Sequence, residues 1–366
     1  MGRNSVDYMR RMLDYESNCI PETMSVMEAL NRLDEVQIKV LFVIDNEYRV
    51  IASLTDGDVR RAILKGIPLD SDVVAFARRK PLTMKLGDEN RIFEELKQRK
   101  LEIVPILDAS DKLIGMYTDE DAIDTDLEKV SVPVVIMAGG KGTRLYPYTK
   151  ILPKPLIPIE DIPISERIMN TFVKVGCNEF YMILNYKRNM IKSYYSENPR
   201  DYEIRFVDES EPLGTGGGLK LLESDIEDTF ILSNCDILIM TDIAKLIKHH
   251  KESGNKATMV CSLKNFEIPY GIVHISDGGE IESMEEKPRM SFFTNTGYYI
   301  LEKEVFRYIE DNERIGMPDI LQRMQKAGLK VGVYPISENA WLDMGQFDSM
   351  DSMERRLREI ENNADI

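Results

Sequence analysis

The chain has 366 residues, 43% of them hydrophobic and 30% charged, a composition that predicts a soluble globular protein of two or three domains. Its formal net charge of −16 argues against a nucleic-acid-binding protein and against docking on an anionic membrane, since both need basic surfaces. The sequence shows no apolar run as long as a membrane span, no apolar signal-peptide core and no CxxC pair among its four cysteines. We therefore expect a cytoplasmic protein with neither a disulfide framework nor a cysteine-bound zinc site.

The first third of the chain contains an internal repeat, because residues 40–60 align without gaps on residues 103–123. Both copies contain Thr-Asp-x-Asp, at residues 55–58 and 118–121, and a threonine followed by acids is typical of the first turn of a helix. Each copy therefore predicts a helix, a buried strand, a turn, a second strand and a helix that begins at the Thr-Asp step. The leading helix of the first copy is indicated by the spacing of four apolar residues, Val26, Ala29, Leu30 and Leu33.

This layout resembles a tandem pair of CBS domains, a βαββα fold, over roughly residues 8–124. The resemblance implies a regulatory module at residues 1–129, with residues 124–133 as a linker. CBS pairs commonly bind adenine nucleotides between their repeats, so an adenine or guanine nucleotide is expected at four residues, Thr55, Asp58, Thr118 and Asp121. The alternative is that these side chains only cap two helices.

Two further features bear on the CBS resemblance. The family's usual glycine near the end of the second strand is Gly115 in the second copy but Ala52 in the first. This difference argues against two equivalent nucleotide sites. CBS pairs also commonly associate with one another, so the resemblance implies a homo-oligomer formed through this module.

The next element, residues 133–138, is a short apolar run that predicts a central parallel strand. It leads into Gly139-Gly-Lys-Gly-Thr-Arg144, whose spacing excludes both a P-loop and a dinucleotide-binding fingerprint. Residues 130–159 contain no Asp or Glu but four cations, Lys141, Arg144, Lys150 and Lys154. Glycines in basic surroundings let a polyphosphate approach backbone N–H groups, so this segment predicts a phosphate-binding loop.

The sequence GGKGTRLYPYT…LPKPLIPI closely resembles the signature of the sugar-nucleotidyltransferases, GT-A-like enzymes that join an NTP to a sugar-1-phosphate. The resemblance extends from residue 133 to about residue 350. It implies an α/β catalytic domain at residues 130–366 with a Rossmann-like mixed sheet, preceded by the CBS pair. The nucleotide would be bound by Ala138, Gly139, Gly140, Gly142, Thr143, Asn185, Leu213, Gly214 and Thr215.

Further motifs follow in the order of that family. PLGTGGGLK, at residues 212–220, is a second glycine-rich turn, and the apolar run at residues 231–236 ends in Asp236, with Cys235 where the family usually has glycine. By resemblance, Asp236 and Asp343 bind Mg²⁺. The sugar phosphate would contact Tyr270, Gly271, Glu286, Lys287 and Asn295.

The resemblance also implies a mechanism in which the sugar phosphate attacks the α-phosphorus of the NTP and expels pyrophosphate. Arg144, Lys154 and Asp236 are the expected catalytic residues: Arg144 steadies the pyrophosphate and Lys154 brings the two phosphates together, while Lys150 is peripheral. No general base is needed, because the attacking phosphate oxygen is already ionised. His249 and His250 are expected in a solvated helix end, and His274 in a strand.

Substrate identity rests on resemblance alone. A CBS pair before this catalytic unit resembles the guanylyltransferases of legionaminic acid biosynthesis, which implies GTP and glucosamine-1-phosphate. The alternatives are a uridylyl- or thymidylyltransferase acting on glucose-1-phosphate, a mannose-type guanylyltransferase, or a non-catalytic protein that senses nucleotides. The presence of Arg144, Lys154, Asp236 and Asp343 together favours an enzyme.

Overall fold

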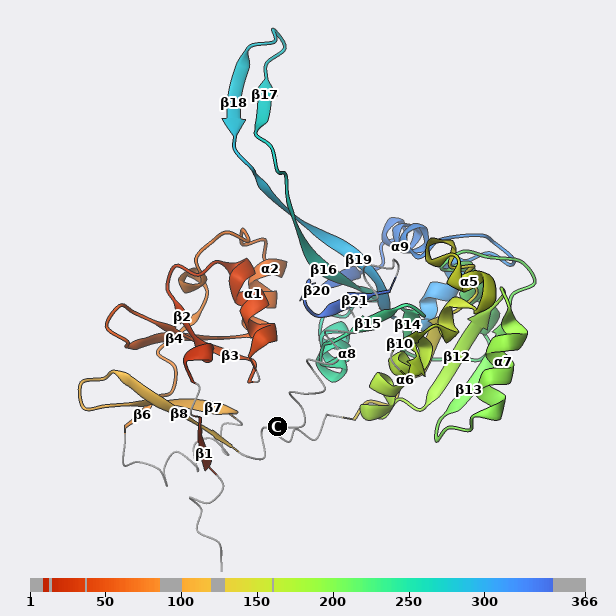
Figure 1. The fold of residues 1–366 in the computed structure, drawn as a ribbon, viewed down its shortest axis with the longest axis horizontal. Helices are drawn as coiled ribbons and strands as arrows, with labels where there is room; N and C mark the ends of the chain where they lie inside the picture. The colour runs from red at the N-terminus through yellow and green to blue at the C-terminus, as the bar shows by residue number, and fades with distance from the viewer. Residues whose placement is uncertain are drawn as a thin grey trace, which may run out of the picture. The chain divides into compact units, whose positions relative to one another are not determined.

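The computed structural model of the chain describes residues 9–12, 15–36, 38–85, 101–119, 129–159 and 161–344. The chain forms two compact units, Met1–Asp126 and Leu127–Ile366 (Figure 1). Within the described residues, no helix is long and apolar enough to cross a membrane.

The first unit contains two four-stranded sheets. One has the strand order β2-β3-β4-β5 and the other β1-β8-β7-β6. The elements of the first sheet and its helices are η2 Glu16–Asn18, β2 Cys19–Pro21, α1 Val26–Glu35, β3 Val40–Ile44, β4 Val50–Thr55, α2 Asp56–Leu64, η3 Val73–Ala75 and β5 Arg78–Arg79. The strands of the second sheet are β1 Met9–Met12, β6 Met84–Lys85, β7 Ile103–Leu107 and β8 Leu113–Asp119.

The internal repeat is confirmed in the backbone. β3 pairs antiparallel with β4 and β7 with β8, and both pairs shift register at matching places, between Val43 and Ile44 and between Ile106 and Leu107. The predicted helix is α1, which buries the four apolar residues that indicated it. A cluster of buried side chains joins the two copies: Ile38, Phe42, Ile103, Leu107, Leu113 and Met116. The helices expected in the second copy lie outside the described residues.

The second unit is built on a seven-stranded sheet with the order β13-β12-β9-β14-β19-β16-β20. Its strands are β9 Val134–Met137, β12 Glu179–Leu184, β13 Glu203–Asp208, β14 Phe230–Asn234, β16 Ala257–Glu267, β19 Arg289–Leu301 and β20 Val331–Ser337. β13, β12, β9 and β14 are parallel neighbours, whereas β19 runs antiparallel to β14 and β16. The predicted central strand is therefore confirmed as β9.

Apolar side chains cover both faces of this sheet. Along β9, Val134 and Ile136 pack in one buried cluster and Val135 in another, because successive side chains of a strand point to opposite faces. The first cluster includes residues of α6 and α8, and the second includes residues of α9 and η6. Burial on both faces explains the unbroken apolar runs of the parallel strands.

The remaining elements of the second unit are short or lie around the sheet. The helices are η4 Thr143–Leu145, α5 Tyr148–Ile151, η5 Lys154–Leu156, α6 Ile164–Lys174, α7 Arg188–Glu197, η6 Gly217–Leu222, α8 Ile243–Glu252, η7 Lys303–Tyr308 and α9 Met317–Lys326. The described part of the unit also contains three two-stranded pairs: β10 Pro158–Ile159 with β11 Ile162–Pro163, β15 Ile237–Ile239 with β21 Trp341–Asp343, and β17 Ile272–Ile275 with β18 Ile281–Glu285.

The expectation that His249 and His250 form a solvated helix end is wrong for His250. That side chain is fully buried, with its ring nitrogens 2.8 Å from Thr258 Oγ1 and 3.1 Å from Glu302 Oε1. Burial lowers the pKa of His250, so the neutral ring is favoured at this internal position. His274 lies in β17, as expected.

Candidate active site

The candidate site lies at the edge of the sheet where the parallel strands end. β9 leads into the first glycine-rich turn, β12 into Asn185, β13 into Glu209, and β14 into Cys235 and Asp236. Because parallel strands share one carboxyl edge, these segments meet there, which is where open α/β sheets bind ligands.

Lys154 and two aspartates form the charged centre of this edge. Lys154 Nζ makes an ion pair with Asp236 Oδ2, and the two side chains are only 17% and 14% exposed. Asp343 joins them because β15 pairs with β21, which sets Ile237 opposite Asp343, and the Met344 N–H donates to the Asp236 carbonyl oxygen at 2.9 Å. The structure thus brings together one predicted catalytic lysine and both predicted metal ligands.

Electrostatics keep this lysine charged. Burial by itself would lower the pKa of Lys154, but the charges of Asp236 and, more weakly, Asp343 outweigh it, and the net pKa is raised. The ammonium group therefore persists at neutral pH, where it can attract phosphate oxygens.

The donors present fit a magnesium ion. Mg²⁺ prefers oxygen ligands and is commonly held by one or two carboxylates, with waters and substrate phosphates completing its shell. Asp236 and Asp343 supply two carboxylates, and the described part of the chain contains no group of three or more His, Cys, Asp or Glu arranged for a metal. That donor set matches a site that is completed by the substrate.

The first glycine-rich turn is fixed against the segment that carries Lys154. Gly142 has φ +61°, and a Cβ added there would lie 2.9 Å from Thr149 Cγ2 and 3.2 Å from Lys154 Cβ. The buried Thr149 hydroxyl donates to the Gly142 carbonyl oxygen at 2.8 Å. Only glycine fits this left-handed, crowded position. Lys141 and Arg144, in contrast, are exposed.

Glu209 links the two glycine-rich turns and was missed by sequence reasoning. The residue is 3% exposed, and its carboxylate lies between Gly139 and Gly218. A Cβ added to Gly139 would be 2.8 Å from Oε2, and one added to Gly218 would be 2.5 Å from Oε1. The Leu213 N–H donates to the carboxylate, while Oε1 has no hydrogen-bond partner. Burial raises the pKa of Glu209 to about 6. The available signal was an acid immediately after a strand that ends at the ligand edge.

A polar cavity of about 370 Å³ adjoins Asn185. Its lining residues are Asn185, Lys187, Arg188, Asn189, Met190 and Ser210. Lys187 has φ +52° and donates to the carbonyl oxygens of Lys150 and Ile151 at 2.5 and 2.7 Å, which ties the cavity wall to α5. Arg188 brings a cation to this wall and was also missed; a basic residue at the first position of a helix carries no strong sequence signal.

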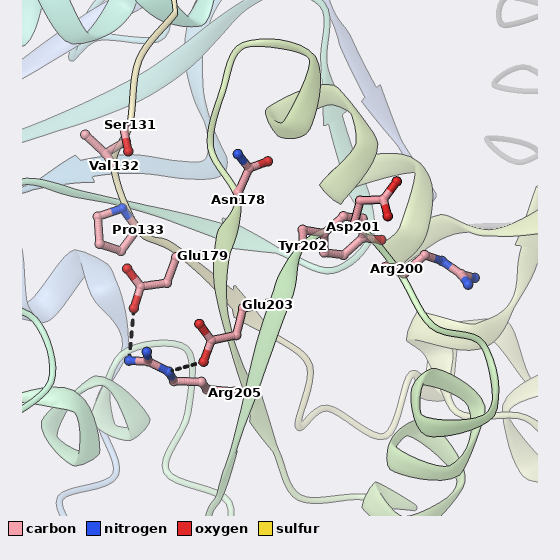
Figure 2. Close-up of a pocket in the computed structure, with 10 residues that line it drawn as sticks. All are labelled: Ser131, Val132, Pro133, Asn178, Glu179, Arg200, Asp201, Tyr202, Glu203 and Arg205. Atoms are coloured by element: carbon pink, nitrogen blue, oxygen red, sulfur yellow. Dashed lines mark hydrogen bonds and ion pairs between the residues drawn. The ribbon is translucent and has the colours of Figure 1, made fainter.

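A larger cavity of about 710 Å³ lies at the opposite edge of the sheet, where β12 and β13 begin (Figure 2). Arg205 crosses it and pairs with Glu179 at 2.9 Å and with Glu203 at 2.8 Å. None of the predicted site residues lines this cavity. It is therefore separate from the candidate site.

The predicted sugar-phosphate residues divide into two groups. Tyr270, Gly271, Glu286 and Lys287 are exposed and lie together on a ribbon that projects from the sheet (Figure 1). In the described part of the chain none of them makes a hydrogen bond or ion pair with Lys154, whose ion pair is with Asp236. A Cβ added to Gly271 would be 3.0 Å from Glu286 Oε2. Asn295 lies instead at the base of the ribbon.

The position of Asn295 is set by local hydrogen bonds. Its Nδ2 donates to the Tyr299 hydroxyl at 2.6 Å, and its Oδ1 accepts from the Gly297 N–H at 2.9 Å. Gly297 in turn fits closely against Asn234, the last residue of β14, because an added Cβ would be 2.2 Å from Asn234 Nδ2. Asn295 thus belongs to the same sheet edge as Asp236.

In the first unit, Thr55 and Asp58 form a complete capping box at the start of α2. The Thr55 N–H and hydroxyl donate to Asp58 Oδ2 at 2.9 and 2.8 Å. Arg61 pairs with Asp58 at 2.5 Å and Arg60 with Asp56 at 2.7 Å. Thr118 lies in β8, but its side chain and the whole of Asp121 fall outside the described residues.

Comparison with known proteins places this geometry in a family. The nucleotidyl transferase family model matches residues 133–359. The chain belongs to the nucleotidyl transferase family. The CBS domain model matches residues 6–65, which correspond to the first copy of the repeat. The α/β fold class with an N-terminal CBS domain is thereby confirmed.

Several curated relatives are sugar-1-phosphate nucleotidyltransferases. The chain is 31% identical to a UTP–glucose-1-phosphate uridylyltransferase of Synechocystis sp. over 58% of its length and 60% of that protein. It is 31% identical to a D-glycero-alpha-D-manno-heptose 1-phosphate guanylyltransferase of Campylobacter jejuni over 52% of its length and 86% of that protein. A crystal structure of HddC from Yersinia pseudotuberculosis matches with 26% identity and a TM-score of 0.49, over 62% of this chain and 99% of that one.

Proposed function

We propose that the protein is an enzyme that condenses an NTP with a sugar-1-phosphate and releases pyrophosphate. The observation that carries the proposal is the convergence of Lys154, Asp236 and Asp343 beside the first glycine-rich turn, at the carboxyl edge of the sheet. Family membership and the named activities of the relatives support the same reaction.

The chain's own residues would act by positioning and by charge, which supply most of the rate in phosphoryl and nucleotidyl transfer. Lys154 binds oxygens of the sugar phosphate and the α-phosphate and holds them in line, while the exposed Arg144 neutralises the departing pyrophosphate. Asp236 and Asp343 would hold Mg²⁺, which when bound supplies positive charge to the phosphates. The backbone N–H groups of Gly139, Gly140 and the residues up to Thr143 would bind the triphosphate.

The finer assignment is GTP with glucosamine-1-phosphate. It rests on the resemblance of a CBS module followed by this catalytic unit to the guanylyltransferases of legionaminic acid biosynthesis. The relatives named above use different nucleotides, so uridylyl, thymidylyl and mannose-type guanylyl transfer remain alternatives, as does a protein that only senses nucleotides. Asn185 and the cavity beside it would contact the base, and Leu213, Gly214 and Thr215 would line the ribose.

The CBS module is proposed to bind an adenine or guanine nucleotide and to regulate the transferase. In the first copy, Thr55 and Asp58 already satisfy one another as a capping box, and Arg60 and Arg61 pair with acids of the same helix. A nucleotide there would have to replace these contacts. Calorimetry with AMP, ATP and GTP on the full chain tests the binding.

The test of the proposed reaction is a panel of four NTPs against glucosamine-, glucose- and mannose-1-phosphate, with pyrophosphate release as the readout. We expect turnover with one pair, near-complete loss in Lys154→Ala and little loss in Lys150→Ala. Lys150 is the matched control, since it is an exposed lysine in the same segment whose Nζ lies 5.5 Å from the centre of the Tyr146 ring. Equal loss in the two variants would contradict the assignment of Lys154, and no turnover with any pair would contradict the proposed reaction.

A further inference from the structure

A two-stranded ribbon extends from the carboxyl edge of the sheet; residues 264–293 are called the arm. β20 pairs with β16 only as far as Leu263, yet β16 and β19 stay paired to Glu267 and Arg289 and then continue into the β17–β18 hairpin (Figure 1). Four residues of extended strand span about 13 Å, so the hairpin begins well beyond the sheet. The exposed large apolar side chains of the arm are Phe266, Tyr270, Val273, Ile275, Ile281, Met284, Met290, Phe292 and Phe293.

The hairpin has one apolar face. Val273 is opposite Met284 and Ile275 is opposite Ile281, and all four are between 45% and 69% exposed. The other face carries polar pairs such as His274 with Ser283. An isolated two-stranded ribbon is marginally stable in water, and a contiguous exposed apolar face marks a docking surface.

Charge indicates what the arm docks on. The arm contains six acids and three Lys or Arg residues, whereas residues 139–159, called the basic loop, contain four Lys or Arg residues and no acid. The basic loop also presents exposed apolar side chains, at Tyr146, Tyr148 and Ile151. The arm and the basic loop are therefore complementary, because their charges are opposite and both expose apolar side chains.

In the structure the hairpin stands away from α5, in the basic loop of its own chain, because it continues the pairing of β16 and β19 beyond the sheet (Figure 1). In a two-fold dimer each arm can lie on the loop of the other chain, and both apolar faces are buried at once. We propose that the arm docks on the basic loop of a second copy of this chain and delivers Tyr270, Gly271, Glu286 and Lys287 to the partner's site. The delivery of sugar-phosphate contacts rests on the proposed function; the docking does not.

Complementation tests the delivery. The first variant, Lys154→Ala, alters the basic loop, and the second, Glu286→Gln/Lys287→Ala, alters the arm. Each variant alone is expected to be nearly inactive. In an equal mixture, half the dimers are mixed and each mixed dimer has one complete site, so about a quarter of wild-type activity should return. A mixture of Lys154→Ala with Asp236→Asn should regain no activity, because neither substitution lies in the arm and each site of a mixed dimer therefore still carries one of them. No recovery in mixtures that light scattering and tagged pull-down show to contain mixed dimers would overturn the inference.

Cross-linking tests the docking without any activity. Tyr148→Cys and Tyr270→Cys are introduced together, and the protein is treated with a short bis-maleimide. Cys177, Cys235 and Cys261 are buried, and the partly exposed Cys19 is also present in the single variants, which control for it. We expect the double-cysteine variant to give a covalent dimer and each single-cysteine variant to give none. The dimer should be lost when Ile275 and Ile281 are also changed to Asp. It should remain when the exposed Val333 of β20 is changed to Asp instead. A product of monomer mass, or no product, would overturn the inference. A covalent dimer of this variant, together with no turnover of the wild-type chain on any substrate, would instead contradict the proposed function and leave the docking intact.

Discussion

Replacement of Glu209 by glutamine tests whether the buried carboxyl between the two glycine-rich turns holds a proton in the folded chain. Burial raises the pKa of the Glu209 carboxyl from 4.5 to about 6, so the folded chain holds a proton there more tightly than the unfolded chain does. This proton stabilises the fold fully below about pH 4.5, and the contribution is lost as the pH rises through 6. A shift of about 1.5 pH units corresponds to about 2 kcal/mol, of which about 1.2 kcal/mol falls between pH 5 and pH 8.

The measurement is urea unfolding of the wild type and of Glu209→Gln at pH 5 and at pH 8, followed by the fluorescence of Trp341, the only tryptophan in the sequence. The free energy of unfolding of the wild type minus that of the variant should be lower at pH 8 than at pH 5 by about 1.2 kcal/mol. The other acids titrate alike in the wild type and the variant, so their effects cancel when one free energy of unfolding is subtracted from the other.

Leu213→Met is the matched control for Glu209→Gln. It disturbs the turn whose N–H donates to Glu209 but removes no ionisable group, so its difference from the wild type should be the same at both pH values. A Glu209→Gln difference that is also independent of pH, or that rises with pH, would refute the reasoning that this carboxyl binds a proton in the fold.

Two further predictions concern the metal and the first unit. Asp236→Asn should keep the fold but lower kcat by about 10²-fold or more, and EDTA should abolish turnover that Mg²⁺ restores; full activity in chelator would exclude the two-aspartate metal site. Thr55→Ala should destabilise α2 by about 1 kcal/mol, seen as faster hydrogen exchange of its amides, while Thr55→Ser should not; unchanged exchange in Thr55→Ala would mean that the capping box contributes nothing.

The sequence was sufficient where local pattern and topology agree. The apolar run at residues 133–138 predicted a central parallel strand, and β9 lies at the centre of the parallel part of the sheet with both faces buried. Motifs that follow such strands necessarily meet at one edge, which is why Asp236 and the first glycine-rich turn could be grouped before the fold was known. Lys154 and Asp343 come from outside those strands, and their grouping came from resemblance.

The failures have physical reasons as well. His250 completes the spacing Ile243, Leu246, Ile247, His250, which places it on the buried face of α8, but the neighbouring lysines suggested a solvated end. Glu209 and Arg188 were missed because their roles depend on which turns approach them in space. The arm could not be foreseen, since alternating apolar residues predict a strand but not whether anything covers its apolar face.

The contact between Lys154 and Asp236 explains how so much charge can be kept in place at the sheet edge before substrate arrives. Two partly buried carboxylates without a cation would repel each other, and a partly buried lysine without an anion would lose its proton more readily. Beside these carboxylates Lys154 keeps its proton, because their charges raise its pKa. In the proposed reaction, Lys154 would exchange its carboxylate partner for a substrate phosphate, and Asp236 and Asp343 would hold the metal ion in place of the lysine. Under the proposed function, the site would change its charge contacts without leaving a partly buried charge uncompensated, which is what a preorganised site for a transferring phosphate requires.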